Sequence, residues 1–197
     1  MRSLLIVGQA DAAAFASGAD ALLADAATAP SPGPPLYLRV RPLGDPGSHD
    51  DISAAVRLQA TGVALACASG ADVQRLGARL AVEEARSGLP DGTLRILAFA
   101  TQTPEAVLAL PSYRGASARL AALIVTPAPA LRGGPLRQAR DLAVIAARAA
   151  SVPVIDAPLV DLDGLRTAAL AARADGFDGM AALSAEQVAV INAAFAL

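Results

Sequence analysis

Short apolar runs alternate with longer alanine-rich stretches along the whole chain, and this alternation constrains the fold more than any other feature. Each short run has the length of one buried strand, whereas the longer stretches carry the apolar spacing of helices. Parallel strands joined by helical crossovers give this order of elements. The expected strands cover residues 3–7, 21–24, 36–40, 62–66, 94–100, 120–125, 152–155 and 179–183.

The stretches between these strands predict helices with recognisable first turns. Asp163 and Ser184 suit the N-cap positions of the last two helices, while Pro104 and Pro135 suit the first turns of theirs. No helix is expected between the second and third strands, because the proline-rich segment 29–35 favours a stiff extended connection. The expected helices cover residues 50–59, 71–86, 104–110, 135–150, 162–174 and 184–195.

Eight strands with helical connections predict a single α/β domain over residues 1–197, folded as a (β/α)8 TIM-type barrel. Such a barrel typically uses about 250 residues, so shortened crossover connections are required. A doubly wound open sheet is the competing architecture. The sequence has no G-x-G-x-x-G after the first strand and no G-x-x-x-x-G-K-[ST], so a nucleotide-binding sheet gains little support.

Composition excludes several kinds of chemistry and partner. All sixteen cationic side chains are arginine, so the chain has no lysine to form an imine or anchor pyridoxal phosphate. One histidine, His49, excludes a multi-histidine metal site. Scattered arginines, a net charge of −2 and the absence of long apolar runs argue against nucleic acid and membrane as partners. The single cysteine, Cys67, fits a cytoplasmic location.

Short motifs occur in a specific order along nearly the whole chain. They are Arg-Ser-Leu-Leu at 2–5, Gly-Ala-Asp-Ala at 18–21, Leu-Arg-Val-Arg-Pro-Leu-Gly at 38–44, Ala-Ala-Arg-Ala at 146–149, Val-Pro-Val-Ile-Asp at 152–156, Val-Asp-Leu-Asp at 160–163, Gly-Phe-Asp-Gly at 176–179, and Gln187 with 190–195. Together they resemble the citrate lyase beta-subunit-like branch of the HpcH/HpaI aldolase group. This resemblance implies a (β/α)8 barrel and magnesium-dependent cleavage of carbon–carbon bonds in β-hydroxyacyl-CoA-type substrates.

The chain departs from that family where the resemblance places its chemistry. The metal-binding glutamate after the fifth strand corresponds to Gln102, and the metal-binding aspartate after the sixth strand corresponds to Pro129. Of the acidic motif after the second strand, only Asp25 remains. Magnesium prefers carboxylate oxygens, which an amide and a proline do not supply. We therefore expect no metal site, no cofactor, and lyase activity that is impaired or absent, as in a pseudoenzyme.

Arg39 is the leading candidate for ligand binding. It lies at the expected carboxyl end of the third strand, where barrel enzymes build their sites, and the resemblance matches it to a carboxylate-binding arginine. The further candidates for substrate binding are Arg41, Asp25, Asp156 and Gln102, each of which also has an ordinary interpretation as a capping, ion-paired or surface side chain. The expected ligand is a small organic acid or an acyl-CoA-type molecule.

Two functions of different classes follow. We favour a non-catalytic barrel retained for binding or assembly, and the alternative is an active carbon–carbon lyase with a modified site. The alanine-rich faces of 71–86 and 135–150 suit either subunit contacts in a homo-oligomer or ordinary packing on the barrel. His49 is expected in solvent, and Cys67 is expected in the core.

Overall fold

A computed structural model describes residues 1–27, 33–126 and 129–196, and these residues form the predicted closed barrel. All strands are parallel and follow one another around the barrel in chain order, and the last pairs with the first. Every expected strand is therefore confirmed, and the open sheet is excluded. The strands are β1 Ser3–Ala10, β2 Ala21–Ala27, β3 Leu36–Arg39, β4 Gly62–Ala66, β5 Arg95–Phe99, β6 Leu120–Ile124, β7 Val154–Asp156 and β8 Gly179–Ala182.

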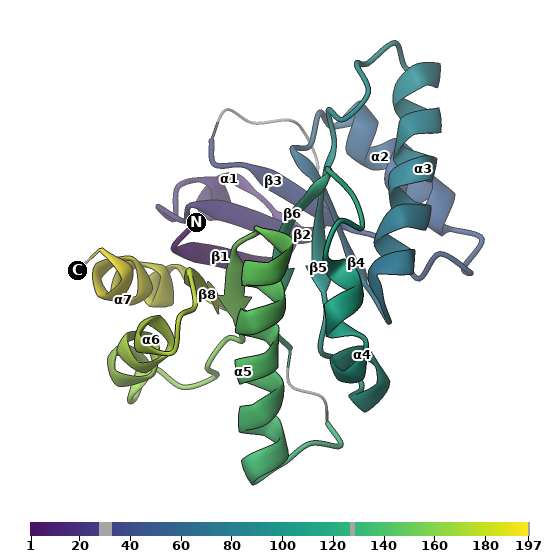
Figure 1. The fold of residues 1–197 in the computed structure, drawn as a ribbon. Coiled ribbons are helices and arrows are strands. Elements are labelled where there is room, and N and C mark those ends of the chain that lie inside the picture. The colour runs from purple at the N-terminus through teal and green to yellow at the C-terminus, as the bar shows by residue number, and fades with distance from the viewer. Residues whose placement is uncertain (28–32, 127–128, 197) are drawn as a thin grey trace.

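The helices cover the barrel unevenly (Figure 1). Long helices follow β4 and β6, whereas only a four-residue helix lies between β1 and β2. Of the expected extended connection, residues 29–32 lie outside the described residues, and residues 33–35 are not helical. The helices are α1 Ala12–Phe15, α2 Ser48–Arg57, α3 Gly70–Arg86, α4 Pro104–Leu108, the 3-10 helix η1 Leu110–Tyr113, α5 Gly133–Ala150, α6 Leu165–Ala174 and α7 Ala185–Phe195.

The helix starts agree with the sequence in all but one case. The Ser184 side chain caps α7 by accepting a hydrogen bond from the Gln187 N–H, 3.4 Å away, and Pro104 occupies the first turn of α4. Asp163 does not cap α6, so that prediction is wrong. Gly164 occupies the cap position with a φ of +78°, a left-handed conformation that glycine adopts without a steric penalty.

Each strand contributes side chains to two separate apolar layers, because successive side chains point to opposite faces of the sheet. The barrel interior holds a small cluster that includes Leu23, Tyr37, Leu97, Phe99 and Ile155. A larger cluster fills the space between strands and helices, and it includes the alanines of α5 at 139, 143, 146 and 147. Those alanines therefore pack on the barrel, the second of the two roles considered for them.

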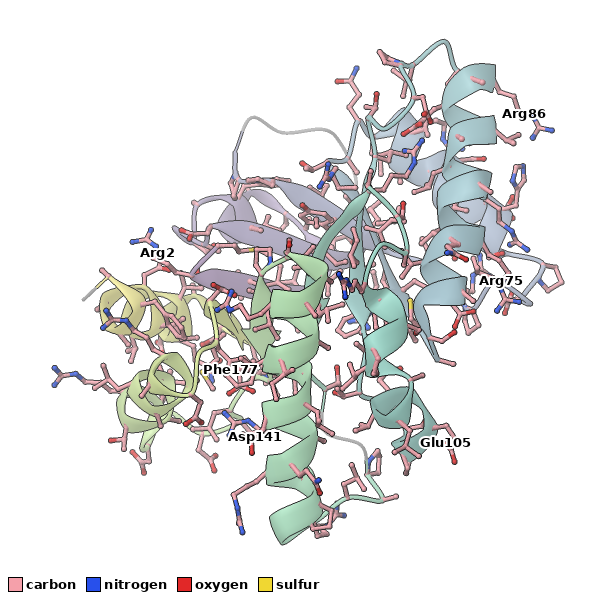
Figure 2. All side chains as sticks on the ribbon, viewed as in Figure 1. Arg2, Arg75, Arg86, Glu105, Asp141 and Phe177 are labelled. Atoms are coloured by element: carbon pink, nitrogen blue, oxygen red, sulfur yellow. The ribbon has the colours of Figure 1, made fainter. Side chains whose placement is uncertain are left out.

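The outer surfaces of the helices carry many charged side chains, with a few exposed apolar ones such as Leu108 and Ile145. Figure 2 shows Arg75 and Arg86 projecting from α3 on the side away from the strands. Val73, Leu76 and Leu80 of the same helix are buried against the barrel. Among the described residues, no helix is long and apolar enough to cross a membrane.

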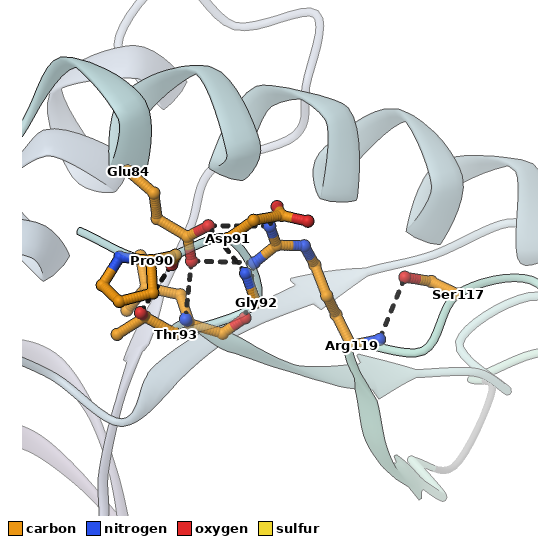
Figure 3. Close-up of polar contacts among 8 residues, drawn as sticks. Glu84, Pro90, Asp91, Gly92, Thr93, Ser117 and Arg119 are labelled. Atoms are coloured by element: carbon orange, nitrogen blue, oxygen red, sulfur yellow. Dashed lines mark hydrogen bonds and ion pairs between the residues drawn. The ribbon is translucent and has the colours of Figure 1, made fainter. Parts of the chain in front are cut away.

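A buried ion pair between Glu84 and Arg119 connects a helix to strands at the amino end of the barrel (Figure 3). The fully buried Glu84 carboxylate accepts two hydrogen bonds from the Arg119 guanidinium, both 2.7 Å long. It also accepts the Leu94 N–H at 2.7 Å and the Gly92 N–H at 3.1 Å, while Arg119 contacts Asp91 as well. Glu84 lies in the last turn of α3, and Leu94 and Arg119 immediately precede β5 and β6, so this cluster connects one helix to two strands.

Candidate ligand-binding site at the barrel mouth

The carboxyl ends of β2 and β3 bring Asp25 and Arg39 together. Leu23 and Tyr37, two residues earlier on the same strands, lie in the barrel interior, so the strand alternation directs Asp25 and Arg39 to the same side. Arg39 Nε donates to Asp25 Oδ1 over 2.7 Å. The Arg39 guanidinium carbon also lies 5.0 Å from the centre of the Phe99 ring. Three strands therefore fix the position of one guanidinium.

Within the described part of the chain, the Arg39 guanidinium keeps two donor groups free. Nε is the donor to Asp25, and the terminal amino groups donate to no acceptor among the described residues. A carboxylate binds an arginine most strongly through two parallel hydrogen bonds from such an edge. The ring on one face and the carboxylate at Nε hold the group in place before any ligand arrives. The side chain is 39% exposed, so a solute has access to it.

A cavity of about 410 Å³ opens beside this guanidinium. Volumes of about 300–1,000 Å³ are usual for sites that bind small molecules. This cavity, which we call the mouth cavity, is large enough for a small acid and has the accessible Arg39 guanidinium in its wall. It is lined by Asp25, Arg39, Val40, Arg41, Pro42, Asp51 and Ala66.

Arg41 also lines the mouth cavity, but two of its three nitrogen donors are used within the protein. Its Nε and Nη2 donate to the two carboxylate oxygens of Asp51 over 2.9 and 2.8 Å, and Nη2 also donates to the Gly47 carbonyl at 2.8 Å. The hydrogen bond from Arg41 holds the pKa of Asp51 below its usual range, despite partial burial of the carboxyl. Arg41 therefore ties the β3–α2 loop to the start of α2.

Asp156 ends β7 as expected, but its side chain faces the helices. Ile155 belongs to the barrel interior, and the alternation directs Asp156 the other way. Arg140 of α5 donates to it through Nε and Nη2, over 3.2 and 2.7 Å. The same guanidinium lies over the ring of Phe177, which Figure 2 labels between α5 and α6. The structure does not bring Asp156 together with Arg39.

The two positions that the resemblance matches to metal ligands carry no carboxylate. Gln102 follows β5 and Pro129 follows β6, and neither lines the mouth cavity. In the described part of the chain, no group of three or more histidine, cysteine, aspartate or glutamate side chains is placed to hold a metal. The two carboxylates that line the mouth cavity, Asp25 and Asp51, are ion-paired with Arg39 and Arg41. This donor set does not fit a hard divalent cation.

Cys67 and His49 lie where the sequence suggests. Cys67 follows β4 and is only 3% exposed, and its burial, reinforced by the charge of Asp72, raises its pKa to about 12. The thiol is thus protonated at neutral pH and a poor nucleophile. His49 is exposed in the first turn of α2.

Sequence reasoning missed Phe99 and Asp51. Phe99 lies two residues after Leu97 on β5, so both side chains point into the barrel. The sequence does not show which face of β5 points inward, so Phe99 could not be placed from it. Asp51 lies in the acidic first turn of α2, a common position for an aspartate that suggests no further role. Its role depends on Arg41, ten residues earlier, and no local pattern signals that contact.

Fold and site together define a (β/α)8 barrel with an accessible arginine at its carboxyl mouth. No known family model matches the sequence, and no curated protein matches it significantly. Among solved structures, RipC from Yersinia pestis superposes with a TM-score of 0.75 at 23% identity, covering 98% of this chain and 94% of RipC.

Two further solved structures have the same barrel. The citrate lyase beta subunit from M. tuberculosis, complexed with oxaloacetate and magnesium, gives a TM-score of 0.74 at 19% identity and covers 98% of this chain and 96% of its own. Native malate synthase from Haloferax volcanii gives 0.76 at 18% identity, with 98% and 74% coverage. At these identities the likeness establishes the fold.

Proposed function

We propose that this chain is a degenerate member of the citrate lyase beta-subunit-like group that binds a small organic acid without cleaving it. The order of the sequence motifs supports the family, and so does the likeness to RipC and to a citrate lyase beta subunit. That beta subunit was solved with oxaloacetate, a small dicarboxylate. The observation that carries the proposal is the Arg39 guanidinium, which is held at Nε and whose terminal amino groups have no acceptor among the residues that the structure describes.

Recognition follows from the geometry of Arg39. A ligand carboxylate would accept two hydrogen bonds from the terminal amino groups, while Asp25 and Phe99 keep the guanidinium in place. Hydrogen bonds to charged groups are worth about 1.5–3 kcal/mol. The negative charge of Asp25 opposes a second carboxylate nearby, so the expected affinity is weak, with a Kd of about 1 mM or somewhat below.

Loss of lyase chemistry follows from the absent carboxylates. Cleavage of a β-hydroxyacyl thioester develops negative charge on an enolate oxygen, and a metal ion normally contributes several kcal/mol to its stabilisation. Gln102 and Pro129 leave no carboxylates to hold such an ion at the positions that the resemblance predicts.

A modified carbon–carbon lyase is the second candidate, and the contact between Asp25 and Arg39 favours it. Removal of a β-hydroxyl proton requires at least a base, and a carboxylate beside a cation, such as Asp25 beside Arg39, can act as one. In this alternative, Asp25 takes the β-hydroxyl proton and the Cα–Cβ bond breaks, which gives a carbonyl product and a thioester enolate. Arg39 stabilises the enolate oxygen, and the proton held by Asp25 then goes to the enolate carbon.

Thermal shift with a parallel thioester-cleavage assay separates the two candidates. Dicarboxylates, oxaloacetate and acyl-CoA thioesters are tested on the wild type, on Arg39→Ala and on Arg137→Ala. Arg137 is an exposed arginine of α5 outside the mouth cavity and serves as the charge-matched control. We expect ligand shifts in the wild type and in the control only, with no turnover. Turnover above background would refute the inactive barrel, and equal shifts in all three proteins would remove Arg39 from the site.

A further inference from the structure

Three neighbouring hollows that share lining residues extend from the barrel mouth to the space between α2 and α3. The mouth cavity shares Pro42 and Ala66 with a second hollow of about 360 Å³. The second hollow shares Arg79 with a third of about 490 Å³, which lies between α2 and α3. We call these three hollows the furrow. Arg39 stands at its inner end, and Arg79 stands where its outer two hollows meet.

Arg79 carries a charge that no carboxylate of the described residues neutralises. Its Nη1 donates to the hydroxyl oxygen of the buried Ser48 over 3.0 Å, and within residues 1–27, 33–126 and 129–196 it takes part in no ion pair. Glu83 lines the third hollow beside it, but that carboxylate accepts a hydrogen bond from Ser53. The neighbouring arginines of α3 differ in this respect, since Arg75 is paired with Asp72 and Arg86 lies 3.7 Å from Glu83. Ser48 thus positions the Arg79 guanidinium and leaves its charge available.

The furrow between Arg39 and Arg79 is lined by uncharged side chains and by two ion pairs. Arg41 is paired with Asp51 and Arg75 with Asp72, so each pair is neutral as a unit. A ligand that extended from Arg39 to Arg79 would therefore meet a cation at each of its own ends and a lining without net charge between them. The uncharged lining residues are Pro42, Leu43, Gly44, Leu65, Ala66 and Ala68.

We infer that Arg79 is a second anion-binding residue and that the ligand is an elongated acid with an anionic group at each end. One carboxylate binds Arg39, and a distal carboxylate or phosphate binds Arg79. This inference rests on the proposed function, because Arg39 supplies the first anchor. A fixed cation at each end selects length as well as charge, since a short acid reaches only one of them.

Calorimetric titration with acids of graded length tests the inference. Linear monocarboxylates are compared with α,ω-dicarboxylates of the same chain length and with ω-phosphorylated carboxylates. Above a threshold length, we expect the doubly anionic ligands to bind about five- to tenfold more tightly than the matched monocarboxylates. The larger gain, with carboxylate or with phosphate, identifies the distal group.

Three variants locate the effect. Arg79→Gln should abolish the gain of the long dianions and leave monocarboxylate affinity unchanged, and Arg79→Lys should restore part of the gain. Arg137→Gln removes an equal charge outside the furrow and should behave like the wild type. If long dianions still bound Arg79→Gln more tightly than monocarboxylates do, or if affinity did not depend on length, the distal site would be refuted. The proposed binding at Arg39 would be unaffected by either result. Monocarboxylate affinity that survives Arg39→Ala would instead refute the proposed function.

Discussion

The two ends of the barrel each hold an arginine–carboxylate pair, and the pairs are built differently. At the amino end, Glu84 is fully buried and Arg119 nearly so, and the carboxylate accepts four hydrogen bonds. At the mouth, Asp25 and Arg39 are 59% and 39% exposed and share one hydrogen bond. A buried pair whose hydrogen-bonding groups are all used stabilises the fold. An exposed pair that shares one hydrogen bond still has donors that can bind a ligand.

Breaking the buried pair gives the largest expected effect. Arg119→Ala leaves the Glu84 carboxylate buried without its counterion, and such losses cost about 3–5 kcal/mol of unfolding free energy. Urea unfolding of the wild type and variant measures the loss. The matched change at the mouth, Arg39→Ala, should cost less than about 1 kcal/mol. Equal losses at the two ends would break the comparison.

Removing the negative charge of the mouth pair should raise the affinity for ligand carboxylates, whereas the substitutions above lower stability. Asp25→Asn keeps an acceptor for Arg39 Nε and removes the charge that opposes a ligand carboxylate. At surface dielectric values this repulsion is about 1 kcal/mol or more, so carboxylate affinity should rise by about fivefold or more at low salt and less at high salt. Calorimetry at two salt concentrations provides the measurement. Weaker binding would show that Asp25 serves the ligand directly.

Acid should weaken the amino end through Glu84. Burial alone would raise the pKa of Glu84, but hydrogen bonds from Arg119 and from the Leu94 and Gly92 amides outweigh it and hold the pKa below its ordinary value. Because the folded pKa is the lower one, this stabilisation is complete above the unfolded pKa of about 4.3 and is lost as the pH falls through the folded value.

The non-titrating variant Glu84→Gln isolates this effect. The difference in unfolding free energy between the wild type and Glu84→Gln should be constant from about pH 7 down to about pH 5 and shrink below about pH 4. Chemical unfolding at stepped pH checks the trend. A difference that stayed constant down to about pH 2 would mean that the cluster does not lower the pKa of Glu84 in the folded protein.

Sequence reasoning predicted the strands well because buried parallel strands form continuous apolar runs. These continuous apolar runs do not show which side chains of a strand point into the barrel and which point to the helices. When both faces of a strand are apolar, the pattern does not show which residues point inward, so Asp156 could not be assigned to the helix side. The short α1 was missed because four residues are too few to show a helical period.

The candidate site was predicted in part. The carboxyl end of β3 was chosen from barrel geometry and family resemblance, and the cavity that opens there contains Arg39, Arg41 and Asp25. The bond that uses the donors of Arg41, and the Phe99 ring under Arg39, depend on residues from other elements. Such contacts arise from tertiary packing, and a single sequence carries no local signal for them.

Calorimetric titration of oxaloacetate, with magnesium and with a chelator, tests most directly whether the mouth recognises acids through Arg39 alone. We expect weak binding with the same Kd under both conditions, lost in Arg39→Ala and kept in the control Arg137→Ala. Binding that required magnesium would contradict this expectation, because it would reveal a metal site that Gln102 and Pro129 do not provide.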